Sequence, residues 1–362
     1  MLVIGGGITG LTCALALAEA GARTLLIDWG RNAGSTANAG SLHVQLQSRF
    51  LRMFPDQAPN VEASLPLYLG AVEEWERLDA CYGPFDLVRE GGLMVAESEA
   101  QLRFLADKVV RERRHGVAAE ILERPDLERI AGWLGPRIVG AELCRNEGKL
   151  NPLLANARLK AAAEGVGVNF VRDRITTLES QGGITAQGAG VYRAGDVVVA
   201  CSWGAGPLAA ALGSRAPTAS EPLHMNITEP AEYRIRHLVQ HAERPITLKQ
   251  FSSGQIVIGG GWPARFDQET PAVRADSLVG NVALAARLVP GIGGLRLIRT
   301  WAGLNNTADG KTILGRVGRG VLAVPGDAGY TLGPLVGRAA AALALGEEPP
   351  FDPTPYSPAR FG

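Results

Sequence analysis

A glycine cluster directly after the first apolar residues constrains this chain more than any other feature. The sequence begins MLVIGGGITG, so Leu2–Ile4 is followed by Gly5, Gly7 and Gly10 in the spacing G-x-G-x-x-G. The next segment, LTCALALAEAG, has helical apolar spacing, and RTLLID indicates a buried strand that ends at Asp28. This is one βαβ unit, in which glycines let the backbone approach a pyrophosphate and the acidic residue accepts a hydrogen bond from a ribose hydroxyl. The pattern predicts a bound dinucleotide.

The segment after this unit favours FAD over NAD. An NAD dehydrogenase normally continues with further βαβ crossovers, whereas residues 31–40 here read RNAGSTANAG and carry mostly small side chains. Such a segment has too little apolar surface to form core, but its backbone could follow a flat, extended ligand, with Arg31 balancing phosphate charge. An ordinary surface loop is the alternative interpretation.

Composition limits the remaining classes. A chain of 362 residues is long enough for two intergrown domains, and 36 basic against 36 acidic residues give no net attraction to nucleic acid or anionic lipid. The four cysteines share no C-x-x-C pairing, so we expect free thiols and neither an iron–sulfur cluster nor a metal site in this chain. No basic leader and no membrane-length apolar run is present, and we expect a cytoplasmic location.

Helical and strand patterns alternate in an order that predicts two domains. Helices are expected at about 61–78, 98–115 and 275–288 and in the alanine-rich C-terminal stretch. Strands are expected at 85–96 and in VNFVRD, GDVVVACSWG, RLIRTWAG and GVLAV, and PITLKQF with GQIVIGGGW indicates an antiparallel hairpin.

These elements favour an α/β (α+β) fold. We expect a discontinuous Rossmann-like FAD-binding domain with an inserted mixed, largely antiparallel β-sheet substrate domain. The first would comprise residues 1–80, 145–215 and 295–362, and the second residues 81–144 and 216–294.

Six motifs resemble those of a known flavoenzyme family. They are VIGGGITGL, GSTANAG, NEGKLNP, VVVACSWGAGPLAAALG, RTWAGLNNTADGKTILG and GDAGYTLGP. Their order is that of the FAD-dependent D-amino-acid oxidase/glycine oxidase (DAO) family. Within it, AGSLHVQLQ, PITLKQ and VIGGGW are most similar to the β (catalytic) subunits of opine dehydrogenases.

The resemblance implies a flavoprotein oxidoreductase. It would oxidise the CH–NH bond of an amino acid or a secondary, opine-like amine by hydride transfer to FAD, and water would hydrolyse the imine. It also implies partner subunits that carry a second flavin and an iron–sulfur cluster. A stand-alone glycine or D-amino-acid oxidase that produces hydrogen peroxide, and a flavin-holding subunit without catalysis, are the alternatives.

The same resemblance implies which residues hold FAD. Ile8 would join the three motif glycines at the pyrophosphate, Gly333 and Pro334 would start the last helix facing the flavin, and the absence of a family-type Cys or His attachment implies non-covalent binding. The full set of implied FAD contacts is Gly5, Gly7, Ile8, Gly10, Asp28, Trp29, Arg31, Ser35, Thr36, Ala37, Asn38, Ala39, Gly40, Ser41, Leu42, Ile175, Ala200, Cys201, Ser202, Trp203, Gly303, Gly329, Tyr330, Thr331 and Leu332.

The substrate side departs from the family pattern. Many amino-acid oxidases of the family have a carboxylate-binding arginine directly after the WAGL-type turn, and this chain has Asn305 there. Lys249 or Arg265 could replace it. The family's Gly-His near the last loop is Gly326-Asp327, which places an acidic group close to the flavin loop.

Four residues are candidates for contact with the flavin or substrate. They are His43, Tyr330, Lys249 and Asn305. His43 follows the small-residue segment and Tyr330 would form a cavity wall. His224 is a further candidate, and a structural role is the alternative for both histidines.

Overall fold

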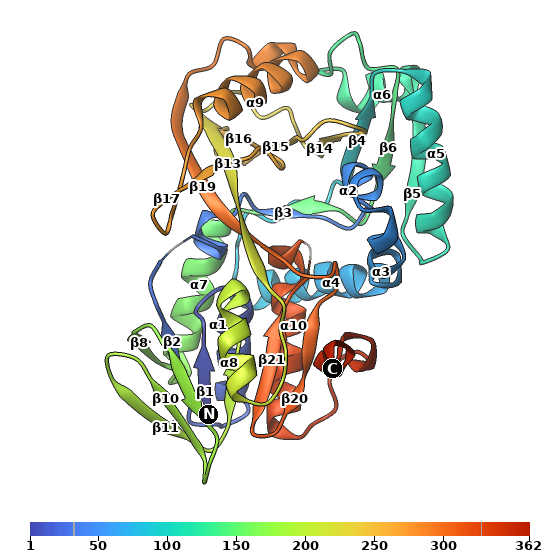
Figure 1. The fold of residues 1–362 in the computed structure, drawn as a ribbon. Helices are drawn as coiled ribbons and strands as arrows, with labels where there is room; N and C mark the ends of the chain where they lie inside the picture. The colour runs from blue at the N-terminus through green and yellow to red at the C-terminus, as the bar shows by residue number, and fades with distance from the viewer. Residues whose placement is uncertain (32, 327) are drawn as a thin grey trace.

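The computed structural model describes residues 1–31, 33–326 and 328–362. One sheet at the base of the molecule is mostly parallel (Figure 1). Its order is β20-β21-β12-β1-β2-β8, and only the pair β20–β21 is antiparallel. The strands are β1 (Leu2–Ile4), β2 (Leu25–Asp28), β8 (Asn169–Arg172), β12 (Val197–Val199), β20 (Ile313–Val317) and β21 (Gly320–Val324).

Both faces of this sheet are covered, which explains its continuous apolar strands. On β1 the side chain of Val3 belongs to one core and those of Leu2 and Ile4 to another, as strand alternation requires. Helices on the Val3 side are α1 (Ile8–Glu19), α4 (Leu65–Tyr82), α7 (Pro152–Gly165) and α10 (Gly329–Leu345). The opposite side is covered by α8 (Ala205–Ala211) and a three-stranded sheet of β9 (Thr177–Glu179), β10 (Ile184–Gln187) and β11 (Val191–Ala194).

A second, larger sheet forms the upper half of the view in Figure 1. Its order is β19-β13-β16-β15-β14-β4-β6-β5, and its neighbouring strands pair antiparallel except for β14 and β4, which are parallel. The strands are β4 (Gly92–Ala96), β5 (Ala119–Glu123), β6 (Gly140–Cys144), β13 (Ala219–Thr228), β14 (Leu238–His241), β15 (Thr247–Gln250), β16 (Ile256–Gly259) and β19 (Leu297–Thr307). Its helices are α5 (Glu99–Arg113), α6 (Arg124–Ala131) and α9 (Ala275–Leu288).

Short elements connect the two sheets. β3 (Ser41–Leu42) pairs with β7 (Gly148–Lys149), and the chain then enters α2 (Ser48–Met53) and α3 (Ala58–Ala63). The hairpin of β17 (Arg265–Asp267) and β18 (Thr270–Ala272) lies outside both sheets. No helix among the described residues is long and apolar enough to cross a membrane.

The α/β fold class with a Rossmann-like part and a second, largely antiparallel sheet is confirmed. The expected hairpin is β15–β16, and the helix expected at 275–288 is α9. Two expectations were wrong in detail: the helix expected at 61–78 is interrupted at Ser64, and the strand expected at 85–96 begins at Gly92. β19, expected with the first domain, pairs with β13 in the large sheet.

The last helix begins earlier than the resemblance implied. α10 starts at Gly329, so Gly333 and Pro334 lie inside it. Proline has no N–H for the carbonyl of Tyr330 four residues back, and Trp75 supplies the missing donor: its Nε1 lies 3.3 Å from the Tyr330 carbonyl oxygen and 3.1 Å from that of Thr331. A side chain from α4 thus lets the helix continue through Pro334.

Candidate cofactor and substrate site

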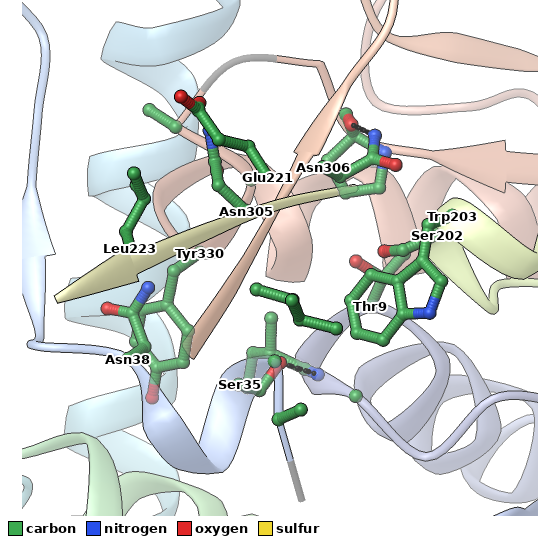
Figure 2. A pocket seen from close by; sticks show the side chains of 18 of the residues that line it. Thr9, Ser35, Asn38, Ser202, Trp203, Glu221, Leu223, Asn305, Asn306 and Tyr330 are labelled. Atoms are coloured by element: carbon green, nitrogen blue, oxygen red, sulfur yellow. Dashed lines mark hydrogen bonds between the residues drawn. The ribbon is translucent and has the colours of Figure 1, made fainter. Parts of the chain in front are cut away.

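A cavity of about 910 Å³ lies between the two sheets and is lined by both. Its wall includes the β1–α1 turn, the small-residue segment after β2, the turn after β12 and the N-terminus of α10, together with residues of β13, β14 and β15. Figure 2 shows wall residues from the small-residue segment, the turn after β12, β13, β19 and α10. Its size is that of a cofactor or ligand site.

The glycine turn is held by Asp28. The Asp28 Oδ2 accepts a hydrogen bond from the Gly6 N–H at 2.7 Å, and Oδ1 accepts one from the Gly30 N–H at 2.7 Å. Gly5 has φ +108°, and a Cβ there would lie 2.6 Å from the Ala200 carbonyl oxygen. The turn therefore requires glycine, because a side chain would both strain the backbone and displace the strand beside it.

Two helix N-termini face the cavity without a side-chain cap. α1 begins after Gly7 and α10 after Ala328, and neither capping residue offers a side-chain hydrogen bond. Gly7 and Ile8 line the cavity at the first, and Gly329, Tyr330 and Thr331 at the second. The positive ends of both helix dipoles thus favour negative or electron-rich ligand groups.

Residues 33–40 of the small-residue segment are fixed in place, unlike a free surface loop. The Ala33 carbonyl accepts from the Leu304 N–H at 2.7 Å, and the Ala37 carbonyl accepts from the indole N–H of Trp301 at 2.8 Å. The Ser35 Oγ accepts the Ile8 N–H at 2.8 Å, which joins the segment to the start of α1. The segment therefore forms one rigid wall of the cavity.

The structure brings most of the expected FAD contacts into this wall. Those that line it are Gly5, Gly7, Ile8, Asp28, Trp29, Arg31, Ser35, Thr36, Asn38, Ala39, Ser41, Ile175, Ala200, Cys201, Ser202, Trp203, Gly329, Tyr330 and Thr331. Those that lie behind it are Gly10, Ala37, Gly40, Leu42, Gly303 and Leu332.

The glycines behind the wall are packed tightly against neighbouring segments of the chain. A Cβ at Gly10 would overlap the Gly5 carbonyl oxygen, and one at Gly40 would overlap the Leu150 carbonyl oxygen. A Cβ at Gly303 would lie 3.1 Å from that of Ala37. These glycines allow neighbouring segments to approach closely.

His43 and Tyr330 are both in the wall. The His43 Nδ1 has no hydrogen-bond partner among the described residues and lies 3.7 Å from Glu147 Oε1. The Tyr330 ring stacks on Trp75 at a centroid distance of 5.2 Å, and burial raises the pKa of its hydroxyl above the usual range. Asn305 also lines the cavity, beside Glu221 of the paired strand (Figure 2).

Lys249 and Arg265 are absent from the wall. The Lys249 side chain is fully buried and its Nζ donates a hydrogen bond to Ser41 Oγ, so Ser41 separates it from the cavity. Arg265 is exposed on β17. The Asp327 carboxylate expected near the flavin loop lies outside the described residues.

Sequence reasoning missed several wall residues and the Glu147 carboxylate, which lies behind the wall. The buried Glu147 carboxylate accepts from the Val44 N–H at 2.9 Å and from the side-chain amides of Gln45 and Gln240 at 2.7 and 3.0 Å. Glu147 belongs to the NEGKLNP motif, but nothing in the spacing relates it to His43, because the contact spans 103 positions between Val44 and Glu147. Arg49 and Arg244 were also missed, and both line the cavity.

His224 is held in place by neutral groups. Its Nε2 lies 2.9 Å from Asn226 Oδ1, and burial lowers the pKa of the imidazole. The Nδ1 of this fully buried side chain has no partner among the described residues, and the residue lines the cavity. His224 is therefore a neutral polar group in the wall.

Unpaired polar atoms in the wall fit a large polar ligand such as FAD. Five buried atoms of wall residues have no hydrogen-bond partner in the described part of the chain: Tyr330 Oη, His43 Nδ1, His224 Nδ1, Gln240 Oε1 and Asn306 Oδ1. Buried polar groups are rarely left unpaired in folded proteins, so such a set marks where a ligand belongs. No group of three His, Cys, Asp or Glu among the described residues could hold a metal ion.

Comparisons with known proteins agree with this site. The family model "FAD dependent oxidoreductase" (DAO) matches residues 1–343. The chain is 27% identical over 337 residues to an opine oxidase subunit of Rhizobium meliloti, covering 86% of this chain and 84% of that protein. It is 26% identical over 329 residues to the corresponding opine oxidase subunit of Agrobacterium tumefaciens (strain Ach5), with the same coverage.

Solved structures share the fold. L-proline dehydrogenase from P. horikoshii matches with a TM-score of 0.84 at 21% identity, over 99% of this chain and 96% of that one. Glycine oxidase from Geobacillus kaustophilus matches with a TM-score of 0.81 at 22% identity, over 98% and 97%. The match of the family model over nearly the whole sequence shows that this chain belongs to the DAO family of FAD-dependent oxidoreductases.

Proposed function

We propose that the chain oxidises the CH–NH bond of an amino acid or secondary, opine-like amine. The observation that carries this proposal is the continuity of the cavity, which joins the glycine turn to a wall of unpaired polar atoms on the large sheet. One end suits the FAD pyrophosphate and the other a small polar substrate. The two related opine oxidase subunits support an opine-like substrate.

FAD would be held along the first part of this wall. The N-terminus of α1 would bind the pyrophosphate, and the Asp28 carboxylate, already accepting two backbone N–H groups, has lone pairs left for a ribose hydroxyl. The cavity cysteine, Cys201, has its pKa raised to about 12 by burial, so it is a neutral thiol. We therefore expect FAD to be bound without a covalent link.

The chain's own residues would orient the amine and accept its proton. FAD supplies the hydride acceptor when it is bound. The His43 Nδ1 lies 3.7 Å from Glu147 Oε1, which leaves Nε2 as the ring atom available to a ligand proton. The N-terminus of α10 would stabilise negative charge that develops on the cofactor. Hydrolysis of the resulting imine needs only water.

The proposal has three forms, which differ in where the electrons of the reduced flavin go. A dehydrogenase would pass its electrons to partner subunits that carry a second flavin and an iron–sulfur cluster, and the fact that both relatives are named as subunits favours this form. A stand-alone oxidase would reduce oxygen to hydrogen peroxide. A flavin-holding subunit without catalysis would have FAD that no amine reduces.

The test is an anaerobic titration of the purified chain, followed through its visible flavin spectrum. Opines, D-amino acids, L-amino acids and N-methyl amines are added one at a time. We expect an N-(carboxyalkyl) amino acid to bleach the flavin, and admission of air then separates oxidase from dehydrogenase. A yellow protein that no amine bleaches, alone or with partner subunits, would overturn the proposed reaction.

A further inference from the structure

Two arginines form a positive corner of the cavity at the large sheet. Arg49 comes from α2, and Arg244 lies in the turn between β14 and β15. The Arg49 Nη1 donates to the Gly261 carbonyl at 3.3 Å, and a Cβ at Gly261 would lie 3.6 Å from the Cβ of Pro245, the residue after Arg244. Both arginines therefore border the same corner, in which Arg49 is half-buried and Arg244 exposed.

Neither guanidinium has a carboxylate partner among the described residues. The acidic residue nearest in sequence, Glu243, is 3.5 Å from Arg52 and accepts from Gln101. Arg52 also lies over the Phe104 ring at 3.8 Å and is not in the cavity wall. The corner thus carries two uncompensated positive charges, and such charges attract an anionic ligand group.

The alternative anchors for a substrate carboxylate are unsuitable. Asn305 brings no charge, and Glu221, Cα-paired with it across β13–β19 and also in the wall, would repel a carboxylate at that place (Figure 2). Lys249 is hidden behind Ser41, and Arg265 is on a hairpin outside the wall. On the large-sheet side of the wall, a carboxylate meets positive charge at the arginine corner, where the adjacent acid, Glu243, is already paired with Arg52.

We propose that Arg49 and Arg244 bind a carboxylate of the substrate and select amines that bear one. This proposal rests on the proposed function. It identifies the substrate class as N-(carboxyalkyl) amino acids, because a second carboxylate distinguishes these from simple N-methyl amines. The guanidinium groups act by binding and positioning and take no part in bond breaking.

The experiment compares R49Q and R244Q with the wild-type holoenzyme. Iminodiacetate, with two carboxylates, and sarcosine, with one, serve as amine probes in anaerobic flavin reduction, and succinate serves as a non-oxidisable probe in a spectral titration. We expect the dissociation constants of iminodiacetate and succinate to rise roughly 10- to 100-fold in each variant. The rate of flavin reduction at saturation should stay within about threefold of the wild type, because the chemistry is unchanged.

R103Q is the matched control, since Arg103 of α5 is an exposed arginine outside the wall, whereas loss of Arg52 would release Glu243 beside Arg244. The control variant should leave the dissociation constants of iminodiacetate and succinate unchanged. R244Q should fold normally, because the side chain of this exposed arginine makes no hydrogen bond or ion pair with the described residues. A change in binding in R244Q is therefore not explained by misfolding.

Unchanged binding in R49Q and R244Q, or equal weakening in R103Q, would overturn the assignment of the corner. A wild type that binds succinate through these arginines but is bleached by no amine would instead contradict the proposed reaction alone.

Discussion

Lys249 is a lysine in a buried position, where a charged amine is unfavourable. Its side chain is fully buried in the hairpin strand β15, and its Nζ donates to Ser41 Oγ. Burial lowers its pKa to about 7, and the nearby Lys149 adds repulsion in the same direction. The amine therefore loses its proton far more easily in the folded protein than in the unfolded chain.

Replacing Lys249 by methionine should change how stability depends on pH. The folded-state pKa is about 7, and an unfolded lysine has a pKa of about 10.4. Between these values the unfolded chain binds more protons, so the wild-type free energy of unfolding gains up to about 1.4 kcal/mol per pH unit from this group. K249M lacks this gain, so the free energy of unfolding of the wild type minus that of K249M should rise from pH 7 to pH 10 in urea denaturation.

An exposed lysine of α7, Lys160, supplies the control variant K160M. Parallel stability curves for wild type and K249M across this range would contradict the neutral, buried state of Lys249.

At the scale of elements, the contact between α1 and α10 depends on missing side chains. Gly333 and Gly337 of α10 face α1, and a Cβ at Gly337 would overlap Thr12 Oγ1 and the Thr9 carbonyl oxygen. The two helices therefore approach closely, and their N-termini reach the same cavity. This contact sets the distance between the two positive helix ends in the site.

Alanine at Gly337 should destabilise the protein by about 1–3 kcal/mol, because the added methyl group forces the helices apart. The affinity for FAD should also fall in this variant, since the N-termini of both helices move. Gly165, the last residue of α7, has nothing within 4 Å of its Cβ position and is the control. G165A should be neutral or stabilising by about 0.5–1 kcal/mol in the same denaturation experiment. Equal effects of the two changes would show that the helix contact tolerates the extra volume.

At the scale of the whole molecule, the site depends on both sheets. One wall comes from the parallel sheet and its helices, and the other from β13, β14 and β15 of the large sheet. A ligand in this cavity contacts segments from Gly5 to Thr331. Binding of FAD should therefore stabilise the folded chain as a whole.

Removal of FAD should lower the melting temperature, and its return should restore it. FAD at 100 times its dissociation constant contributes about 2.7 kcal/mol, which corresponds to a few degrees for a chain of this size. In D28A the glycine turn loses two hydrogen-bond acceptors, so the same FAD concentration should give a smaller shift in scanning calorimetry. An identical shift in wild type and D28A would argue against FAD at this turn.

The sequence by itself determined the features that depend on neighbours along the chain. The strand, glycine turn and helix at residues 2–19 follow from local spacing, and so do the hairpin β15–β16 and helix α9. The motif glycines also indicated the cofactor class, because only bare backbone permits such a turn.

Tertiary structure decided what depends on distant partners. α10 continues through Pro334 because Trp75 of α4 replaces the missing N–H, and no local pattern announces that donor. Lys249 was a candidate for contact with the flavin or substrate, yet all four residues of β15 are buried, since a central strand is covered on both faces. The pairing of His43 with Glu147 and the placement of Arg49 and Arg244 in one cavity wall arise only when separate segments pack together.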